Sequence, residues 1–452
     1  MDVKTADDAE WSLSTVLVYA AGTAVIVGVV LLPTLVPSPY AKLLNTLLLV
    51  LLLGLVGRTY LGTILSFVSL AGPDVDPTAE RPTVSVVIPA YNEEPVLAET
   101  IEACQRLDYP AEKLEIVVCY EAASTDATAE VAKRAAANDP RVVAVERDEP
   151  GGGKAMATNF ALGYATGDVI ASIDADHQFK PDAVERAVRW FLADEDIWCV
   201  KGRCYGRNPT DSLLALHATV ERHIAELADL YARQVFGGFT IFGGGQAFFR
   251  AELFRELGEF DETVLVEDID MSAKIHAHEK KLRVDPNVVT YEENPATFAA
   301  WWSQRKRWAR GWMQVATRYL PTLPRDRTLS FRTRLDVTYT FSYAVVPVFF
   351  VIAAPMFVLG WLGVDTSVYL PAPGVLWQAI GVAPVVTSWL IFARDGLVGN
   401  PHHPWEYLAA ITLWPYLFFQ SVVYMVAFLD EFVFDADSVY VTTSRAENRS
   451  RD

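Results

Sequence analysis

Two carboxylates separated by one residue, Asp174 and Asp176, directly follow the apolar run 169–173. Carboxylates this close repel each other unless a cation lies between them. Mg²⁺ and Mn²⁺ prefer oxygen ligands, and such an ion commonly bridges one or two carboxylates to a diphosphate. The pair therefore predicts a site for Mg²⁺ or Mn²⁺.

Other polar residues also follow apolar runs. Residues 90–93, Ala-Tyr-Asn-Glu, come after the run 83–89, and Glu121 comes after the run 114–119. A polar turn that opens a helix can be a simple cap. Glu267 and Asp268 stand at the mouth of another predicted helix, where an acidic group can cap the helix or serve as a general base.

A glycine-rich turn, Gly151-Gly152-Gly153, leads into Lys154, with Asn159 five residues further on. Backbone amides in such a turn can approach a phosphate closely. The spacing is not that of a P-loop, because an earlier glycine and a hydroxyl residue after the lysine are missing. A plain loop is the alternative interpretation.

The segment 301–319 combines four tryptophans with several basic residues. A basic and aromatic helix of this kind is typical of the membrane interface. The residues are Trp301, Trp302, Trp308, Trp312, Arg305, Lys306, Arg307 and Arg310.

Alternating strand and helix patterns position these residues. Apolar, β-branched runs predict strands over 83–89, 114–119, 141–145 and 169–173, and helical patterns cover 95–107, 125–137, 154–164 and 181–192. Such alternation predicts an open α/β sheet with parallel strands and helices on both faces. Ligands of such sheets bind beyond the carboxyl ends of the strands, where the residues above are expected.

Five nearly uncharged stretches flank this block: 13–36, 43–70, 337–364, 373–393 and 408–429. Each is long enough to cross a bilayer as a helix. The chain is 52% hydrophobic yet carries a net charge of −18, and the block 72–334 holds almost all of its charged residues. This acidity argues against nucleic acid and against anionic lipid as the main partner of the block.

The topology of the C-terminal half stays open in the sequence. Two spans before a cytosolic block place the N-terminus inside, and three spans after it place the C-terminus outside. The basic tail residues Arg445, Arg449 and Arg451 favour the inside, so one stretch is a candidate to lie in the interface or re-enter. Arg58, in the second stretch, either snorkels to the cytosolic surface or faces a polar path.

The four cysteines lack metal-ligand spacing and are expected to be buried free thiols, as in a reducing compartment.

Taken together, these motifs resemble the processive family 2 glycosyltransferases, which include cellulose, hyaluronan and poly-N-acetylglucosamine synthases. The family's carboxylate, DxD, (T)ED and QxxRW elements correspond in order to Glu121, Asp174/Asp176, Glu267-Asp268 and Gln304-Arg305-Lys306-Arg307-Trp308. The likeness runs from about Val84 to Trp312 and includes the flanking apolar stretches.

The resemblance implies a GT-A-type α/β nucleotide-sugar-binding domain inserted between transmembrane helices. It divides the chain into two N-terminal transmembrane helices (1–71), a cytosolic glycosyltransferase domain (72–298) and amphipathic interfacial helices with QxxRW (299–334). About three C-terminal transmembrane helices (335–430) and a tail (431–452) follow. The expected location is the cell membrane, with multiple passes and a cytoplasmic catalytic domain.

The resemblance also implies site roles. Residues near the nucleobase, ribose and the rest of the donor are Ala90, Tyr91, Glu93, Glu121, Lys154, Asn159 and Asp174. Asp176 would hold the metal, assisted by Asp174 and His177, and Asp268, beside Glu267, would be the base. Gln304 and Arg307 would neutralise the diphosphate, and Trp308 would stack on the acceptor sugar.

The implied reaction is metal-dependent, inverting transfer from a nucleotide-sugar, expected to be a UDP-sugar, onto a β-linked polysaccharide exported through the protein's own spans. The expected partners are a glycan or lipid-linked acceptor and membrane lipid. One departure affects nucleobase choice, because Glu121-Ala122-Ala123-Ser124 stands where the family has Asp-Asp-Gly-Ser. Two alternatives remain: transfer of one sugar to a lipid carrier, and a catalytically silent membrane scaffold.

Overall fold

The computed structural model describes residues 3–5, 12–35, 39–76, 78–149, 153–437 and 440–442. Two glycines of the predicted turn, Gly151 and Gly152, lie outside these residues. The tail residues Arg445, Arg449 and Arg451 lie outside them as well.

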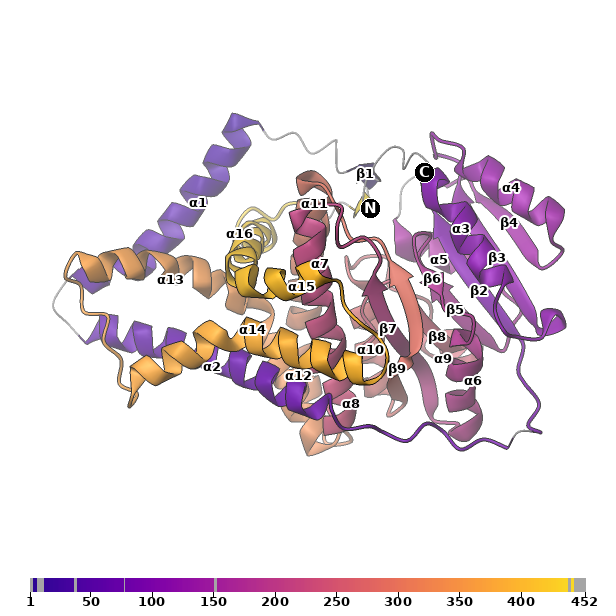
Figure 1. Cartoon of the computed structure of the whole chain (residues 1–452). Coiled ribbons are helices and arrows are strands. Elements are labelled where there is room, and N and C mark those ends of the chain that lie inside the picture. The colour runs from indigo at the N-terminus through magenta and orange to yellow at the C-terminus, as the bar shows by residue number, and fades with distance from the viewer. Residues whose placement is uncertain are drawn as a thin grey trace.

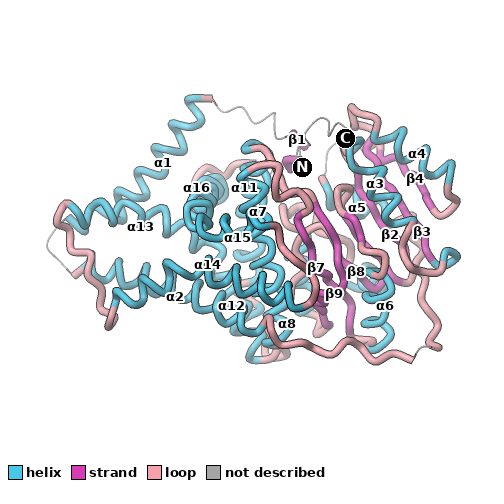
Figure 2. Tube along the Cα trace, in the orientation of Figure 1, coloured by secondary structure: helices cyan, strands magenta, loops and turns pink. Residues whose placement is uncertain are grey.

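A mixed eight-stranded sheet lies between helices in the charged block, in the order β4-β3-β2-β5-β8-β7-β9-β6 (Figures 1 and 2). The four predicted strands are confirmed, and they pair in parallel as expected. The sheet is not parallel throughout, because β8 runs antiparallel to β5 and β7 and β6 runs antiparallel to β9. The strands are β2 (Val84–Ala90), β3 (Leu114–Glu121), β4 (Val142–Arg147), β5 (Val169–Ile173), β6 (Gln178–Phe179), β7 (Ile197–Gly206), β8 (Gln246–Arg250) and β9 (Lys281–Glu292).

Helices cover both faces of the sheet because successive strand residues point to opposite sides. Val86 and Ile88 of β2 are buried in the apolar layer under α3, α4 and α6, whereas Val87 belongs to the layer under α5. All four cysteines are buried and free, as predicted. The helices are α3 (Glu94–Gln105), α4 (Thr128–Asn138), α5 (Lys154–Leu162) and α6 (Ala183–Ala193).

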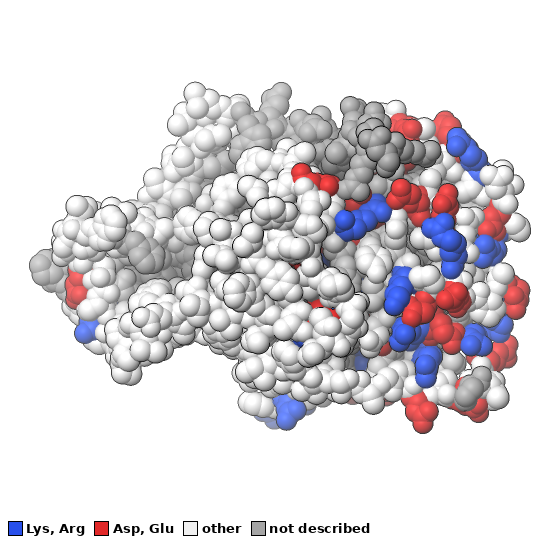
Figure 3. Space-filling view, viewed as in Figure 1, with Lys and Arg blue, Asp and Glu red and all other residues white. Residues whose placement is uncertain are grey.

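Long apolar helices extend away from the sheet and confirm the five predicted stretches. The candidate spans are Leu13–Leu35, Tyr40–Leu65, Phe331–Trp361, Pro373–Leu397 and Pro404–Phe432. Charged side chains gather over the sheet domain and become sparse over these helices (Figure 3). The chain is therefore built as a multi-pass membrane protein. The helices are α1 (Leu13–Leu31), α2 (Tyr40–Leu65), α12 (Phe331–Ser342), α13 (Val346–Trp361), α14 (Pro373–Leu397), α15 (Pro404–Ala409) and α16 (Leu413–Phe432).

A buried ion-pair cluster joins α2 to the sheet domain. Arg58 Nη1 lies 2.6 Å from Asp229 and Arg58 Nη2 lies 2.8 Å from Asp336, and Arg233 pairs with both carboxylates. Asp229 belongs to the π-helical turn η4 (Ala225–Tyr231), whose backbone approaches α2 so closely at Gly62 that a Cβ there would collide with it. The charge of Arg58 is thus paired with carboxylates and holds the helix against this part of the protein.

Helix α16 does not follow the direction of the other apolar helices. In Figure 1 it is seen almost end-on, whereas α2, α13 and α14 lie lengthwise. It packs along α11 (Phe298–Tyr319) at both ends: Trp301 Nε1 donates to Tyr416 Oη at 3.0 Å, and Lys306 Nζ lies 2.6 Å from Asp430. Both ends of α16 therefore contact the helix that borders the sheet domain.

The remaining short elements connect these units, and the two chain ends pair as a small parallel sheet. They are β1 (Val3–Thr5), η2 (Leu32–Leu35), η3 (Ala111–Lys113), α7 (Leu213–Ile224), α8 (Ala232–Phe236), α9 (Ala251–Leu257), α10 (Glu267–Ala277), η5 (Leu323–Arg325), η6 (Tyr343–Val345), η7 (Ala410–Thr412) and β10 (Tyr440–Thr442).

Candidate active site

A cavity of about 690 Å³ opens at the carboxyl ends of β2, β3 and β5. This edge includes the point where the strand order reverses, at which open α/β sheets bind ligands. The cavity brings together all but one of the residues that the sequence analysis assigned to the site. They are Ala90, Tyr91, Glu93, Glu121, Lys154, Asp174, Asp176, His177, Glu267, Asp268, Gln304, Arg307 and Trp308.

The exception is Asn159, which does not line the cavity. Its amide nitrogen donates to Phe260 O and to the Glu262 carboxylate, and its oxygen accepts from Phe260 N. The side chain is therefore occupied in holding the loop after α9. The sequence analysis placed it near the donor, and its contacts give it a structural position instead.

The DxD carboxylates lie against a glycine that leaves them room. Asp174 N donates to Gly245 O at 2.8 Å, and a Cβ at Gly245 would collide with Asp174 and His177. Lys154 Nζ lies 2.6 Å from Asp174 Oδ1 and 3.7 Å from Glu267 Oε1. Lys154 thus links the DxD pair to the acidic mouth of α10.

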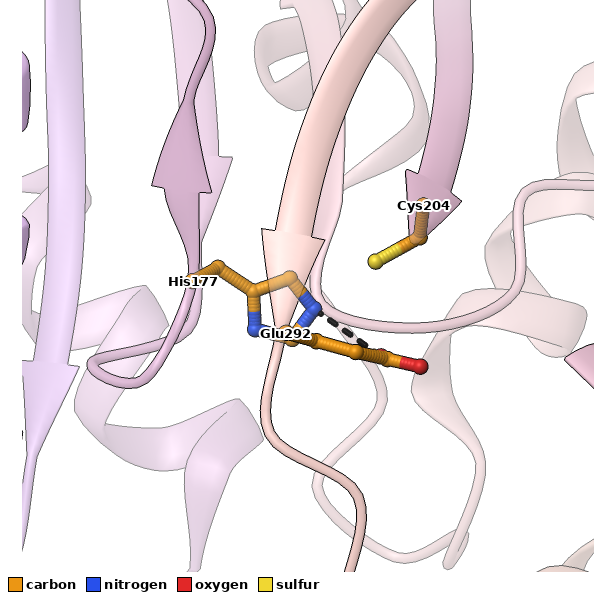
Figure 4. Close-up of side chains that lie close together, drawn as sticks. All are labelled: His177, Cys204 and Glu292. Carbon is orange, nitrogen blue, oxygen red and sulfur yellow. Dashed lines mark ion pairs between the residues drawn. The ribbon is translucent and has the colours of Figure 1, made fainter. Parts of the chain in front are cut away.

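His177 lies between Asp176 and a second carboxylate, Glu292, at the end of β9. Figure 4 shows the ion pair between His177 and Glu292. Its Nδ1 lies 2.9 Å from Asp176 Oδ1 and its Nε2 lies 3.2 Å from Glu292 Oε2. Burial alone would lower the pKa of His177, but the charge of Asp176 together with the contacts to Asp176 and Cys204 raises that pKa well above its ordinary value. Both ring nitrogens are engaged, so His177 orients Asp176 in this arrangement.

Arg222 of α7 completes this chain of contacts. Its Nε donates to Glu292 at 2.6 Å. Burial opposes ionisation of Glu292, yet the Arg222 guanidinium lowers the pKa of that carboxyl to about 2. Cys204, the third residue in Figure 4, is buried beside His177, and burial raises the pKa of its thiol.

Asp268 lies in the first turn of α10 and accepts two backbone hydrogen bonds. Gly244 N donates to Oδ2 at 3.0 Å and Ile269 N donates to Oδ1 at 2.8 Å. Burial, with the adjacent Glu267 charge, raises the pKa of Asp268 to about 6. A carboxylate with such a pKa can accept a proton near neutral pH.

Helix α11 closes the cavity and supplies its aromatic wall. Gly311 allows α11 to approach Val266, which directly precedes the Glu267-Asp268 pair, because a Cβ there would lie 2.6 Å from a Val266 methyl group. The Trp308 ring packs against the Arg305 guanidinium, 4.6 Å from the ring centroid. Arg307 Nη1 donates to Leu265 O at 3.4 Å.

The cavity also reaches helix α16, through residues that the sequence analysis missed. Glu221 accepts hydrogen bonds from Tyr416 Oη at 2.9 Å and from Gln420 Nε2 at 3.0 Å, and Gln420 and Tyr424 line the cavity. Polar residues four apart within an apolar stretch are a usable signal for such a position. Glu292 also had a signal, since it ends the β-branched run 288–291.

Negative charge dominates the lining. Among the described residues, ten carboxylate side chains and four basic side chains border the cavity. Ligand atoms of Asp174, Asp176 and His177 lie within 4.8 Å of one another. Oxygen ligands with excess negative charge fit Mg²⁺ or Mn²⁺, with Asp174 and Asp176 as the natural holders.

Comparison with known proteins identifies the domain that carries this site. Residues 85–258 match the sequence model of the family "Glycosyl transferase family 2". These residues form a family 2 glycosyltransferase domain. The GT-A α/β fold with flanking apolar helices, expected from the sequence, is thereby confirmed.

Curated family 2 relatives include enzymes of two kinds. The chain is 30% identical over 243 residues to the probable glycosyltransferase YdaM of Bacillus subtilis, and 29% identical over 248 residues to the beta-monoglucosyldiacylglycerol synthase of Synechocystis. These alignments cover 53% and 54% of this chain, and only 58% and 50% of the relatives. The chain is also 25% identical over 292 residues to the poly-beta-1,6-N-acetyl-D-glucosamine synthase of Staphylococcus epidermidis, and this alignment covers 63% of this chain and 69% of that one.

A solved family 2 structure matches the fold over most of the chain. It is the mannosyltransferase PcManGT of Pyrobaculum calidifontis in complex with GDP-Man and Mn²⁺. The two share 25% identity with a TM-score of 0.60, covering 87% of this chain and 100% of that one.

Replacing Asp268 by asparagine should raise the midpoint of thermal unfolding at pH 7.5 and leave it nearly unchanged at pH 4. A carboxylate whose pKa is raised by folding costs stability as the pH rises from about 4 to 6, and the full cost is present above pH 6. The upper bound is roughly 2–3 kcal/mol. Scanning calorimetry of the detergent-purified variant would measure this, with exposed Glu256→Gln as control. A midpoint lowered at pH 7.5 would contradict the raised pKa.

Proposed function

We propose that the enzyme transfers a sugar from a nucleotide-sugar, preferentially a UDP-sugar, onto a growing β-linked polysaccharide. The observation that carries this proposal is the continuity of the cavity. It runs from Tyr91 and Glu121 at the strand ends to Gln420 and Tyr424 on the apolar helix α16. An acceptor can therefore reach the reacting atoms from the membrane side.

The chemistry of the membrane-side wall favours a sugar acceptor over an acyl chain. Trp308 and Trp312 offer aromatic faces, on which the CH faces of sugars pack. Glu221, Gln420 and Tyr424 offer polar groups that match hydroxyls. A glycan that occupies this channel lies beside the apolar helices, so the growing chain can be exported between them.

The proposed donor roles follow the positions of the residues. Asp174 and Asp176 hold a divalent ion that, when bound, offsets the charge of the departing diphosphate. Gln304 and Arg307 face the same end of the cavity. Tyr91, Glu93 and Glu121 border the nucleobase side, where Arg147 neutralises Glu121 at 2.8 Å. PcManGT was solved with GDP-Man and Mn²⁺, so guanine donors belong in the same screen.

In the transfer step, an acceptor hydroxyl attacks the anomeric carbon and the bond to the diphosphate oxygen breaks. Asp268 takes the hydroxyl proton. One base and direct displacement give inversion, so an α-linked donor yields a β-linkage. The beta-monoglucosyldiacylglycerol synthase relative supports a second candidate, transfer of a single sugar to a lipid.

Purified enzyme with Mn²⁺ or Mg²⁺ should release nucleotide from one member of a UDP- and GDP-sugar panel, with product that grows in length. Asp268→Asn should lower kcat by at least about 10²-fold, because the proton acceptor is removed. Wild-type kcat/KM should fall about tenfold per pH unit below pH 6, where Asp268 is protonated.

Asp176→Asn should abolish metal-dependent nucleotide release, and the control variant Glu256→Gln, at an exposed position, should not. A product in which one sugar is attached to a lipid would favour the second candidate over polymerisation. Nucleotide release that is unchanged in Asp268→Asn would contradict the assignment of Asp268 as the base.

We further propose that the catalytic domain is cytoplasmic and that α16 lies in the membrane interface. Both ends of α16 contact α11, and Arg310 Nη1 donates to Asp437 O just beyond it. A helix held at both ends by the interfacial helix does not cross the bilayer. The C-terminal end of α16 then lies on the same side as the catalytic domain.

Cysteine labelling tests this topology, because all four native cysteines are buried. An impermeant maleimide added to spheroplasts should label Ser367→Cys, in the exposed loop between α13 and α14. Asp437→Cys should react only after permeabilisation. Labelling of Asp437→Cys in intact spheroplasts would show that α16 crosses the membrane.

A further inference from the structure

A second pocket, of about 230 Å³, lies where two apolar helices reach the sheet domain. Its wall includes Phe67 and Leu70, just beyond the end of α2, and Leu397 and Val398, at the end of α14. Leu397 is 82% exposed and Val398 is 61% exposed. The pocket thus lies at the ends of two helices that are long and apolar enough to cross a bilayer.

Arg283 of β9 lines this pocket without a close ion pair. Its Nε is buried with no hydrogen-bond partner, and among the described residues its guanidinium forms no ion pair. Its charge acts on Asp194 without a direct contact, and its guanidinium lies 5.9 Å from the centroid of the Trp190 ring. A partly buried cation without an acceptor is costly unless a ligand supplies one.

Arg394 adds a second guanidinium to the wall of the pocket. Its Nε donates to Ser66 O at 2.6 Å and its Nη1 lies 3.2 Å from Asp395. These contacts fix the side chain between α2 and α14. The Arg394 guanidinium also lies 5.9 Å from the Tyr231 ring centroid, and Tyr231 borders the pocket as well.

The one carboxylate in the wall, Asp285, is already engaged. Trp190 Nε1 donates to Asp285 Oδ2 at 2.8 Å, and Asn287 N donates to Oδ1 at 2.9 Å. It lies beyond ion-pair distance of Arg283. The pocket thus combines two guanidinium groups with an exposed apolar rim.

We propose that this pocket binds the anionic headgroup of a phospholipid. The headgroup phosphate accepts from Arg283 and Arg394, and the acyl chains run along the exposed rim at Leu397 and Val398. Basic residues between membrane helices on the cytoplasmic side recognise anionic headgroups in this way. Aromatic rings such as Trp190 and Tyr231 suit the interfacial depth. This site is separate from the transfer reaction and does not depend on the donor or acceptor.

Lipid retention by the full-length protein tests the site directly. Detergent-purified protein would be titrated with phosphatidylglycerol and, separately, phosphatidylcholine, and bound lipid counted by native mass spectrometry. The wild type should retain phosphatidylglycerol over phosphatidylcholine. Arg283→Gln should bind phosphatidylglycerol roughly fivefold more weakly, Arg283→Lys should recover most of the binding, and exposed Arg255→Gln on α9 should match the wild type.

Two results would overturn the proposal. One is equal retention of the two lipids by the wild type, and the other is equal phosphatidylglycerol binding by Arg283→Gln and the wild type. Inorganic phosphate that displaces phosphatidylglycerol at millimolar concentration would assign the pocket to a free anion instead. Because the readout is bound lipid, its failure leaves the transferase proposal intact, and loss of transferase activity leaves the lipid result intact.

Discussion

Repulsion between carboxylates is the constraint on which this structure depends. Ten of them border one cavity, opposed by four basic side chains among the described residues. Specific contacts reduce this repulsion: Lys154 bridges Asp174 and Glu267, and His177 lies between Asp176 and Glu292. The residual negative charge is what a divalent ion fits. Burial, with the adjacent Glu267 charge, raises the pKa of Asp268 to about 6, which suits proton transfer near neutral pH.

Membrane attachment and catalysis share the same helices. Helix α11 touches the strand-end loops through Gly311 and Val266, and it packs along α16 through Trp301 and Tyr416. The acceptor wall is thus built partly from a helix whose composition is that of a membrane segment. This sharing explains how a water-facing sheet can place its base within reach of an acceptor on the membrane side.

Much of this arrangement could be predicted from local sequence. The strands that carry Tyr91, Glu121 and Asp174 are short apolar runs, so their carboxyl ends, and hence most of the cavity, were predictable. Strand β8 was not, because antiparallel insertion between β5 and β7 depends on distant pairing and leaves no local pattern.

The errors have physical causes as well. Asn159 stands at the sequence position of a residue near the nucleotide-sugar donor. Its side-chain amide instead forms a hydrogen bond with the backbone of Phe260, 101 residues further along the chain. The sequence left Arg58 open between snorkelling and facing a polar path, because its partners, Asp229 and Asp336, lie far along the chain. Gln420 and Tyr424 are polar positions in an apolar stretch, and whether they reach the cavity depends on how α16 packs.

The most direct test of the central claim is calorimetric titration of Mn²⁺ into the full-length protein, with and without UDP or GDP. If the carboxylate cavity is a metal–diphosphate site, Mn²⁺ and the nucleotide must strengthen each other's binding, by the same factor in either order of addition. Asp176→Asn should lose this coupling. Nucleotide binding that is indifferent to Mn²⁺, or coupling that survives in Asp176→Asn, would contradict the account.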